Sequence, residues 1–213
     1  MQLTQVEEND MNTKTVDVKG MQLEIPDYYQ KVRSMDGDPE DSVPFLFQTP
    51  RAACLLLMMP IQPDRAMNVQ PDELVEILHG MLEKQQGLIE VKAGDDYIYS
   101  IVKDLQEGGG VQYILTFQKK FGDRILSLRG YFDEMGVTGL RESAVLQLCM
   151  QNHLVGSEND PMEGWAMDPY DPDFSKGIRM NLSEQEEFDG MFPEFPLSLC
   201  RALLKTVCES QNN

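Results

Sequence analysis

The sequence predicts an α+β fold: an antiparallel meander sheet flanked by helices, with an acidic, aromatic-containing C-terminal extension and a final helix. Two observations predict it. Four strand-like segments joined by turns rich in glycine and aspartate follow residue 87, as in a meander. Segments with apolar side chains at helical spacing stand on both sides of them. We therefore expect a flexible arm over residues 1–19, a sandwich domain over residues 20–153, and an extension over residues 154–213 that packs on this domain.

The N-terminal part is expected to begin with a single strand. Residues 1–19 are polar and unpatterned, which indicates a mobile arm or a marginal first strand. Residues 21–25 alternate apolar and polar side chains, the period of a half-buried strand, and Pro26 ends the run. A solvated loop is expected over residues 28–41, because its last part places four acids around a glycine and a proline.

Residues 43–48 and 52–59 are predicted to form two further strands. The second is apolar on both faces, as expected for a central strand. Pro60 and Pro63 are expected to close it, because proline has no N–H group to donate to a neighbouring strand.

The clearest helix is predicted from Pro71 to Gln86. Pro71 suits the first helical position, and Gly87 suits the left-handed position beyond the end. Its apolar side chains recur at the spacings of one buried stripe: Leu74, Ile77, Leu78, Met81 and Leu82.

The four strands of the meander are predicted over residues 88–92, 97–106, 111–121 and 124–132. Glycines in their connections are expected to supply the positive φ angles that hairpins need. In the third strand Tyr113, Leu115 and Phe117 fall on one side. The buried face of the last strand stays open, because Ile125 and Leu126 break its alternation.

A second helix is predicted over residues 138–151, with Thr138 as its cap. It is expected to cover one face of the meander. Its apolar stripe consists of Leu140, Ala144, Val145, Leu148 and Cys149.

The C-terminal extension differs in composition from the rest. Residues 155–195 hold 11 acids but only two basic residues. Their aromatic side chains are too many for a disordered tail and need a surface to pack on. These are Trp165, Tyr170, Phe174, Phe188, Phe192 and Phe195. Ser183 and Glu186 have the spacing of a capping box, and a final helix to about Glu209 opens at Pro196 and is expected to dock on the domain.

The overall charge restricts the classes of partner. The chain has 36 acidic and 18 basic residues, a net charge of -18, which repels nucleic acid and anionic membrane surfaces. Its N-terminus lacks a basic segment followed by an apolar run, as a secretory signal requires. The longest apolar stretch, Ala52 to Met59, is far too short to span a bilayer. The expected location is therefore the cytoplasm.

No catalytic or cofactor-binding residue stands out. The four cysteines are scattered, without the close pairs of a zinc or redox motif. Cys149 and His153 lie one helical turn apart but lack an orienting third group. No Lys-Ser or Lys-Thr follows Gly108 to Gly110, so this segment is predicted to be the turn of a hairpin and not a phosphate-binding loop. With two histidines in the chain, an enzyme without a recognisable motif stays the third hypothesis.

A cluster of carboxylates lies in the extension, in the segment DPYDPDF. Its members, Asp168, Asp171 and Asp173, form either a solvated acidic turn or an oxygen-rich metal site, and their spacing does not fit a calcium loop. We therefore predict no metal. The same carboxylates flank Trp165, Tyr170 and Phe174. This pattern fits a partner-binding surface with apolar anchors and a charged rim, or aromatics that simply cover the parent sheet.

The order of elements resembles the PsbP-like fold of PsbP and of the Ran-binding Mog proteins. The residues that carry the resemblance are MQLEIPDYY, PDELVEIL and YIYSIVKDLQEGGGVQYILTFQKKFGDRILSLRGYF, within residues 20–153. The resemblance implies an α/β/α sandwich and a binding or accessory role. It carries no catalytic residue over to this chain.

The leading hypothesis is a non-enzymatic protein-binding module whose acidic surface meets a basic partner. A second acidic loop, with Asp36, Asp38, Glu40 and Asp41, either helps to steer that partner or is only a solvated connection. The second hypothesis is a binder of an apolar small molecule in a cleft between the sheet and a helix.

Overall fold

The computed structural model describes residues 12–62 and 70–210. Its strands are β1 (Thr13–Val18), β2 (Met21–Pro26), β3 (Gln30–Lys31), β4 (Val43–Gln48), β5 (Ala52–Ile61), β6 (Gln86–Ala93), β7 (Tyr97–Leu105), β8 (Val111–Phe121), β9 (Arg124–Glu134), β10 (Ala166–Met167) and β11 (Met180–Asn181). Its helices are α1 (Pro71–Met81), α2 (Leu140–Gln151) and α3 (Pro196–Glu209), with the 3-10 turns η2 (Leu182–Glu184) and η3 (Glu186–Met191). No helix among these residues has both the length and the apolar character needed to cross a bilayer.

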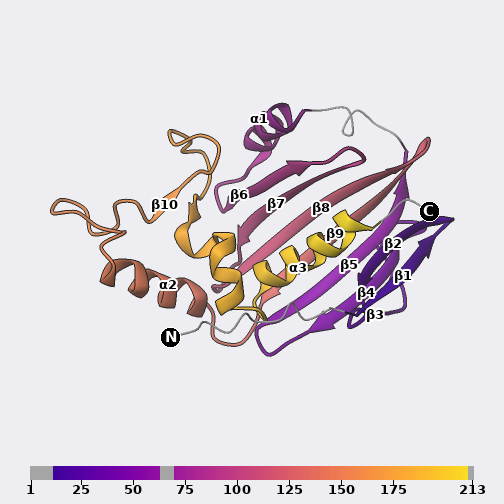
Figure 1. The fold of residues 1–213 in the computed structure, drawn as a ribbon, viewed down its shortest axis with the longest axis horizontal. Helices are drawn as coiled ribbons and strands as arrows, with labels where there is room; N and C mark the ends of the chain where they lie inside the picture. The colour runs from indigo at the N-terminus through magenta and orange to yellow at the C-terminus, as the bar shows by residue number, and fades with distance from the viewer. Residues whose placement is uncertain (1–11, 63–69, 211–213) are drawn as a thin grey trace, which may run out of the picture.

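Seven strands form one antiparallel sheet in the order β3-β4-β5-β9-β8-β7-β6 (Figure 1). The predicted meander is its larger half, from β6 to β9, and β5 pairs with the last strand of that meander. The predicted α+β fold with an antiparallel meander is confirmed. Gly122, in the turn between β8 and β9, has the predicted positive φ, of 64°.

One face of the sheet is covered by α3 and by the hairpin of β1 and β2 (Figure 1). This layer and the strands share the main core, in which Leu23 of the hairpin, Phe117 of β8 and Leu203 of α3 are buried together. Residues 13–18 therefore form a first strand, the second alternative for this segment, and Thr13 pairs opposite Pro26 of β2. Residues 1–11 of the predicted arm lie outside the described residues.

A smaller core lies where α1 packs on β6. Val75 and Leu82 pack against Leu88 and Val91. The helix is shorter than predicted and ends at Met81. Its stripe is only partly buried, since Met81 is 72% exposed.

Gly87 corrects the predicted end of this helix. It lies inside β6 and does not have the positive φ of a helix cap. A Cβ atom at this position would lie 2.4 Å from the carbonyl oxygen of Ile178. Glycine is required here because two backbone segments cross, and not because a helix ends.

The second helix also corrects the prediction. Its residue before the first turn is Gly139, at φ 72°, and Thr138 is not the cap. Instead of covering the meander, α2 packs against the C-terminal segment, where Val145 and Cys149 contact Val155 and Trp165. The helix that covers the meander is α3, whose buried apolar side chains share the main core with the strands.

Pro60 lies within β5, opposite Leu126 of β9, so it does not close that strand. The pairing of β5 with β4 reaches only to Met58. Beyond that residue β5 has a neighbour on one side only, a position in which a strand tolerates proline. Pro63 lies outside the described residues.

Candidate functional site

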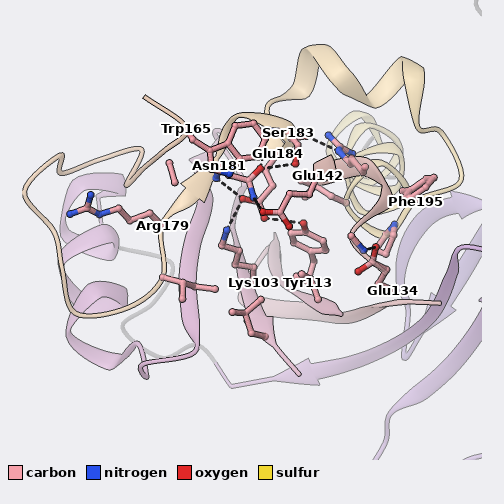
Figure 2. Close-up of a pocket in the computed structure, with 18 residues that line it drawn as sticks. Lys103, Tyr113, Glu134, Glu142, Trp165, Arg179, Asn181, Ser183, Glu184 and Phe195 are labelled. Carbon is pink, nitrogen blue, oxygen red and sulfur yellow. Dashed lines mark hydrogen bonds and ion pairs between the residues drawn. The ribbon is translucent and has the colours of Figure 1, made fainter. Parts of the chain in front are cut away.

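A cavity of about 220 Å³ lies where the ends of β7 and β8 meet α2 and the C-terminal segment (Figure 2). Lys103 and Tyr113 reach it from the sheet, Arg141 from α2 and Glu184 from η2. Figure 2 shows Lys103 and Tyr113 converging on Glu184. The strands supply the floor of the cavity and the C-terminal segment supplies its roof.

The centre of this group is a buried ion pair. The Nζ atom of Lys103 lies 2.7 Å from Oε2 of Glu184, and the two side chains are 5% and 3% exposed. Glu184 also accepts hydrogen bonds from the Tyr113 hydroxyl (2.9 Å) and from the Asn181 backbone N–H (2.7 Å). Three donors on one carboxylate compensate for the cost of taking it out of water.

Glu184 is held by a capping box at the start of η2. The Asn181 side chain accepts from the Ser183 backbone N–H at 2.9 Å, while Glu184 accepts from the Asn181 backbone. The predicted box of Ser183 and Glu186 is thus shifted by two residues, because asparagine caps a helix start as well as serine does.

Tyr113 is a permanent hydrogen-bond donor in this site. Burial, and then the negative charge of Glu184, raise the pKa of Tyr113 well above its usual value. The phenol therefore stays protonated at neutral pH. Its one hydrogen bond to Glu184 fixes the carboxylate and does not resemble an acid or base aimed at a substrate.

Arg141 joins α2 to three other segments. Its guanidinium donates to the Ser183 carbonyl (2.6 Å), the Ser198 hydroxyl (2.8 Å) and Asp189 (2.9 Å). Asp189 also pairs with Arg201 at 3.2 Å. This network fixes α2, η2, η3 and α3 relative to one another.

Sequence reasoning missed both buried cations of this cavity, although a signal was available. Lys103 follows Tyr99 and Ile101 at the two-residue period of the buried face of β7. Arg141 precedes Val145 and Cys149 at the four-residue period of the buried face of α2. A charged residue in register with apolar ones indicates a buried charge with a partner.

The six residues predicted to bind a partner fall into two groups. Trp165 is buried beside α2 and lines the cavity. Asp168 is 2% exposed and accepts from the backbone N–H groups of Tyr170 and Asp171, each at 3.0 Å, and its other oxygen lies 3.1 Å from Nε2 of His79. These contacts make Asp168 the centre of a folded turn.

The other members of the DPYDPDF segment sit on the edge of the sheet. The Tyr170 hydroxyl accepts from the Val91 backbone N–H of β6 at 2.6 Å. Phe174 stacks on the His79 ring with a centroid distance of 4.0 Å. Asp171 and Asp173 are exposed. Within residues 12–62 and 70–210, no group of three or more His, Cys, Asp or Glu side chains is placed to hold a metal ion.

A second candidate surface extends from the end of α2 to this turn, and we define the acidic lobe as residues 148–173. Its loops project beyond the sheet in Figure 1. The lobe contains six acids and no lysine or arginine. It also exposes large apolar side chains: Leu148, Met150, Leu154, Met162, Met167 and Tyr170.

Backbone hydrogen bonds hold the first loop of the acidic lobe in one shape. The Gly156 N–H donates to the Glu163 carbonyl (2.9 Å), and the Ser157 N–H donates to the Asp160 carbonyl (2.8 Å). Leu154 and Met162 therefore stand at the two ends of a closed loop whose tip carries Asp160. Apolar and acidic side chains are presented together.

The comparisons with known proteins give structural similarity only. No family model and no curated protein matches the chain. Similar solved structures include the Ran-binding protein Mog1p of Saccharomyces cerevisiae, with a TM-score of 0.43, 9% identity and coverage of 93% of each chain. Cyanobacterial PsbP from Synechocystis has a TM-score of 0.41 and 13% identity, covering 68% of this chain and 91% of its own. LpqN of Mycobacterium tuberculosis has a TM-score of 0.35 and 10% identity, covering 68% and 82%.

The resemblance to PsbP and Mog proteins is confirmed, since structures of both kinds are among these neighbours. At TM-scores of 0.43 and below they carry no argument about function. The functional argument depends on the geometry of this chain.

Proposed function

We propose that this chain is a non-enzymatic protein-binding module that docks a basic partner segment on its acidic lobe. The observation that carries the proposal is that exposed acids and exposed apolar side chains coincide in residues 148–173, where no lysine or arginine balances them. Apolar anchors surrounded by charge are the arrangement of a protein interface. Methionine suits such a surface because its flexible side chain adapts to the partner.

The six residues predicted from the sequence have different parts in this proposal. Trp165 and Asp168 support the lobe from within, and Phe174 holds it on α1. Tyr170, Asp171 and Asp173 are the exposed members and would contact the partner. The partner chemistry that fits is a positively charged, amphipathic segment, with lysine or arginine facing the acids and apolar residues facing Leu154 and Met162.

The state of the cysteines supports the absence of thiol catalysis in this proposal. Burial raises the pKa of Cys54 to about 12 and also raises the pKa of Cys149, Cys200 and Cys208. A thiol with a raised pKa supplies little thiolate, the nucleophilic form. His153, one helical turn from Cys149 in the sequence, lies beyond the end of α2.

Calorimetry tests the proposal by measuring the affinity for a synthetic helical peptide of lysine and leucine. The titrations are made at low and at high salt. The wild-type chain is compared with a lobe variant, Glu158→Gln, Asp160→Asn and Glu163→Gln. The matched control, Asp36→Asn, Asp38→Asn and Glu40→Gln, removes the same charge from the other acidic loop.

We expect the lobe variant to bind at least about tenfold more weakly and the control variant to bind like the wild type, with all affinities falling as salt rises. Equal weakening in both variants would mean that net charge alone attracts the peptide. An affinity for the peptide that does not depend on salt would contradict the proposal that the acidic lobe attracts the partner by its charge.

A further inference from the structure

We propose that the cavity beside Lys103 binds a small uncharged molecule through a carbonyl oxygen, with the apolar part of the molecule against Trp165. This cavity shares Trp165 with the acidic lobe, but none of the exposed acids of the lobe lines it. It also replaces the apolar ligand of the second hypothesis with a ligand of mixed character. Four features of the cavity carry the inference.

The first feature is the unused donor capacity of Lys103. An ammonium group has three N–H donors, and among the described residues its Nζ atom makes one hydrogen bond, to Glu184. The side chain is 5% exposed, so bulk water does not readily supply the other acceptors. A buried donor without an acceptor is costly, and an oxygen atom in the cavity would remove that cost.

The second feature is that the neighbouring polar groups are already satisfied. Glu184 accepts from Lys103, Tyr113 and Asn181. The Arg141 guanidinium donates to four acceptors, on η2, η3, α3 and on Gln185 between the two 3-10 turns. What the cavity lacks is therefore an acceptor for Lys103, and not a donor for a carboxylate.

The third feature is the balance of charge. The lining side chains include three cations and three carboxylates: Lys103, Arg141 and Arg179, with Glu134, Glu142 and Glu184. A carboxylate ligand would add a negative charge beside Glu184, whose side chain is 3% exposed, in a site whose charges are already balanced, and such a charge is costly to bury. A neutral carbonyl satisfies Lys103 without that cost.

The fourth feature is shape. Leu105, Val111, Trp165 and Leu197 give the cavity an apolar wall. An engineered cavity of about 150 Å³ holds benzene. The volume here is about 220 Å³, so by simple scaling it has room for roughly nine non-hydrogen atoms.

Three probes of this size separate the contributions of the carbonyl group, of a negative charge and of the apolar ring to binding. Benzamide carries a neutral carbonyl, benzoate carries a charged carboxylate, and isopropylbenzene has the same number of heavy atoms without an acceptor. Trp165 is the single tryptophan of the chain and lines the cavity, so its fluorescence and its indole N–H resonance report on occupancy directly. We expect saturable binding of benzamide, at least about tenfold tighter than that of either other probe.

Two variants complete the test. Val111→Phe fills the cavity from the apolar wall and leaves Lys103 in place, so benzamide binding should be lost. Lys103→Met combined with Glu184→Gln removes the ion pair without leaving a lone buried charge, and the preference for benzamide over isopropylbenzene should disappear. If the double variant does not fold, the Val111→Phe variant still decides whether benzamide binds in this cavity.

Four outcomes would overturn the inference. Equal binding of all three probes would indicate an apolar pocket without carbonyl recognition. Tighter binding of benzoate would mean that Lys103 selects a charged group. An unchanged Trp165 signal at saturating benzamide, or binding that survives Val111→Phe, would place the ligand outside this cavity or show that water occupies it.

Discussion

The two C-terminal helices differ in what they do with their apolar residues. The helix α3 buries eight residues, among them Leu203 and Val207, and completes the main core. The helix α2 buries three, one of which is Arg141, and leaves Leu148 and Met150 exposed at the start of the acidic lobe. The hydrophobic effect of the main core therefore holds α3 in place, whereas a smaller apolar cluster and directional polar bonds hold α2. Leu148 and Met150 stay available for a partner.

Truncation of a core leucine should give the largest effect and the sharpest contrast between α3 and the acidic lobe. Leu203→Ala in α3 removes a fully buried side chain and should lower the free energy of unfolding by about 4 kcal/mol. Leu154→Ala, in the acidic lobe, removes a side chain that is 65% exposed and should change it by less than about 0.5 kcal/mol. Urea denaturation measures both, and equal losses would mean that the lobe belongs to the core.

Removal of the Arg141 guanidinium should have the next largest effect. Arg141→Met breaks its hydrogen bonds to η2, η3 and α3, and we expect a loss of about 3 kcal/mol. Arg179→Met is the control, because Arg179 also lines the cavity but is exposed. Hydrogen exchange should quicken first in α2 and only slightly in α3; uniform quickening would contradict the division between the helices.

The attachment of the C-terminal segment to the edge of the sheet can be weakened at a glycine. A Cβ atom on Gly177 would lie 2.2 Å from the carbonyl oxygen of Gln86 in β6. Gly177→Ala should therefore cost about 2 kcal/mol, because backbone atoms must move. Gly190→Ala is the matched control, since a Cβ atom there meets nothing within 4 Å. Thermal unfolding of the two variants gives the comparison. Identical midpoints would show that the contact between Gly177 and the Gln86 carbonyl does not restrict the backbone.

A pH dependence should give the smallest effect, and it concerns α3. Burial alone would raise the pKa of Glu90, but hydrogen bonds from Lys92 and Tyr99 and the charge of Arg201 outweigh it and lower this pKa. A lowered carboxyl pKa contributes stability above the ordinary value of about 4.3, and that contribution is lost as pH falls through the folded-state value. Glu90→Gln should reduce the loss of stability on acidification. Parallel curves for Glu90→Gln and the wild type would exclude the interaction with Arg201 as a source of stability.

The strand β8 and the final helix were predictable from the sequence because their burial follows a simple period. The two-residue alternation of Tyr113, Leu115 and Phe117 states which face is buried. The stripe of α3 is equally regular. Local pattern and tertiary environment agree in these elements.

The position of α2 and the cavity were not predictable in the same way. An apolar stripe indicates that one face of a helix is buried, but it does not indicate which element that face packs against. The prediction that α2 covers the meander is wrong for this reason. The role of Gly87 depends on Ile178, which lies far along the chain. The partner of Lys103 is Glu184, 81 residues away, and no local pattern encodes a contact at that distance.

The most direct test of the central claim is to map the binding of the lysine and leucine peptide by amide chemical shifts in the intact chain. The account predicts that the perturbed amides lie in residues 148–173, with those of α3 and of residues 36–41 unchanged. Perturbations centred on residues 36–41, or spread over every acidic surface, would contradict the claim that the acidic lobe is the docking site.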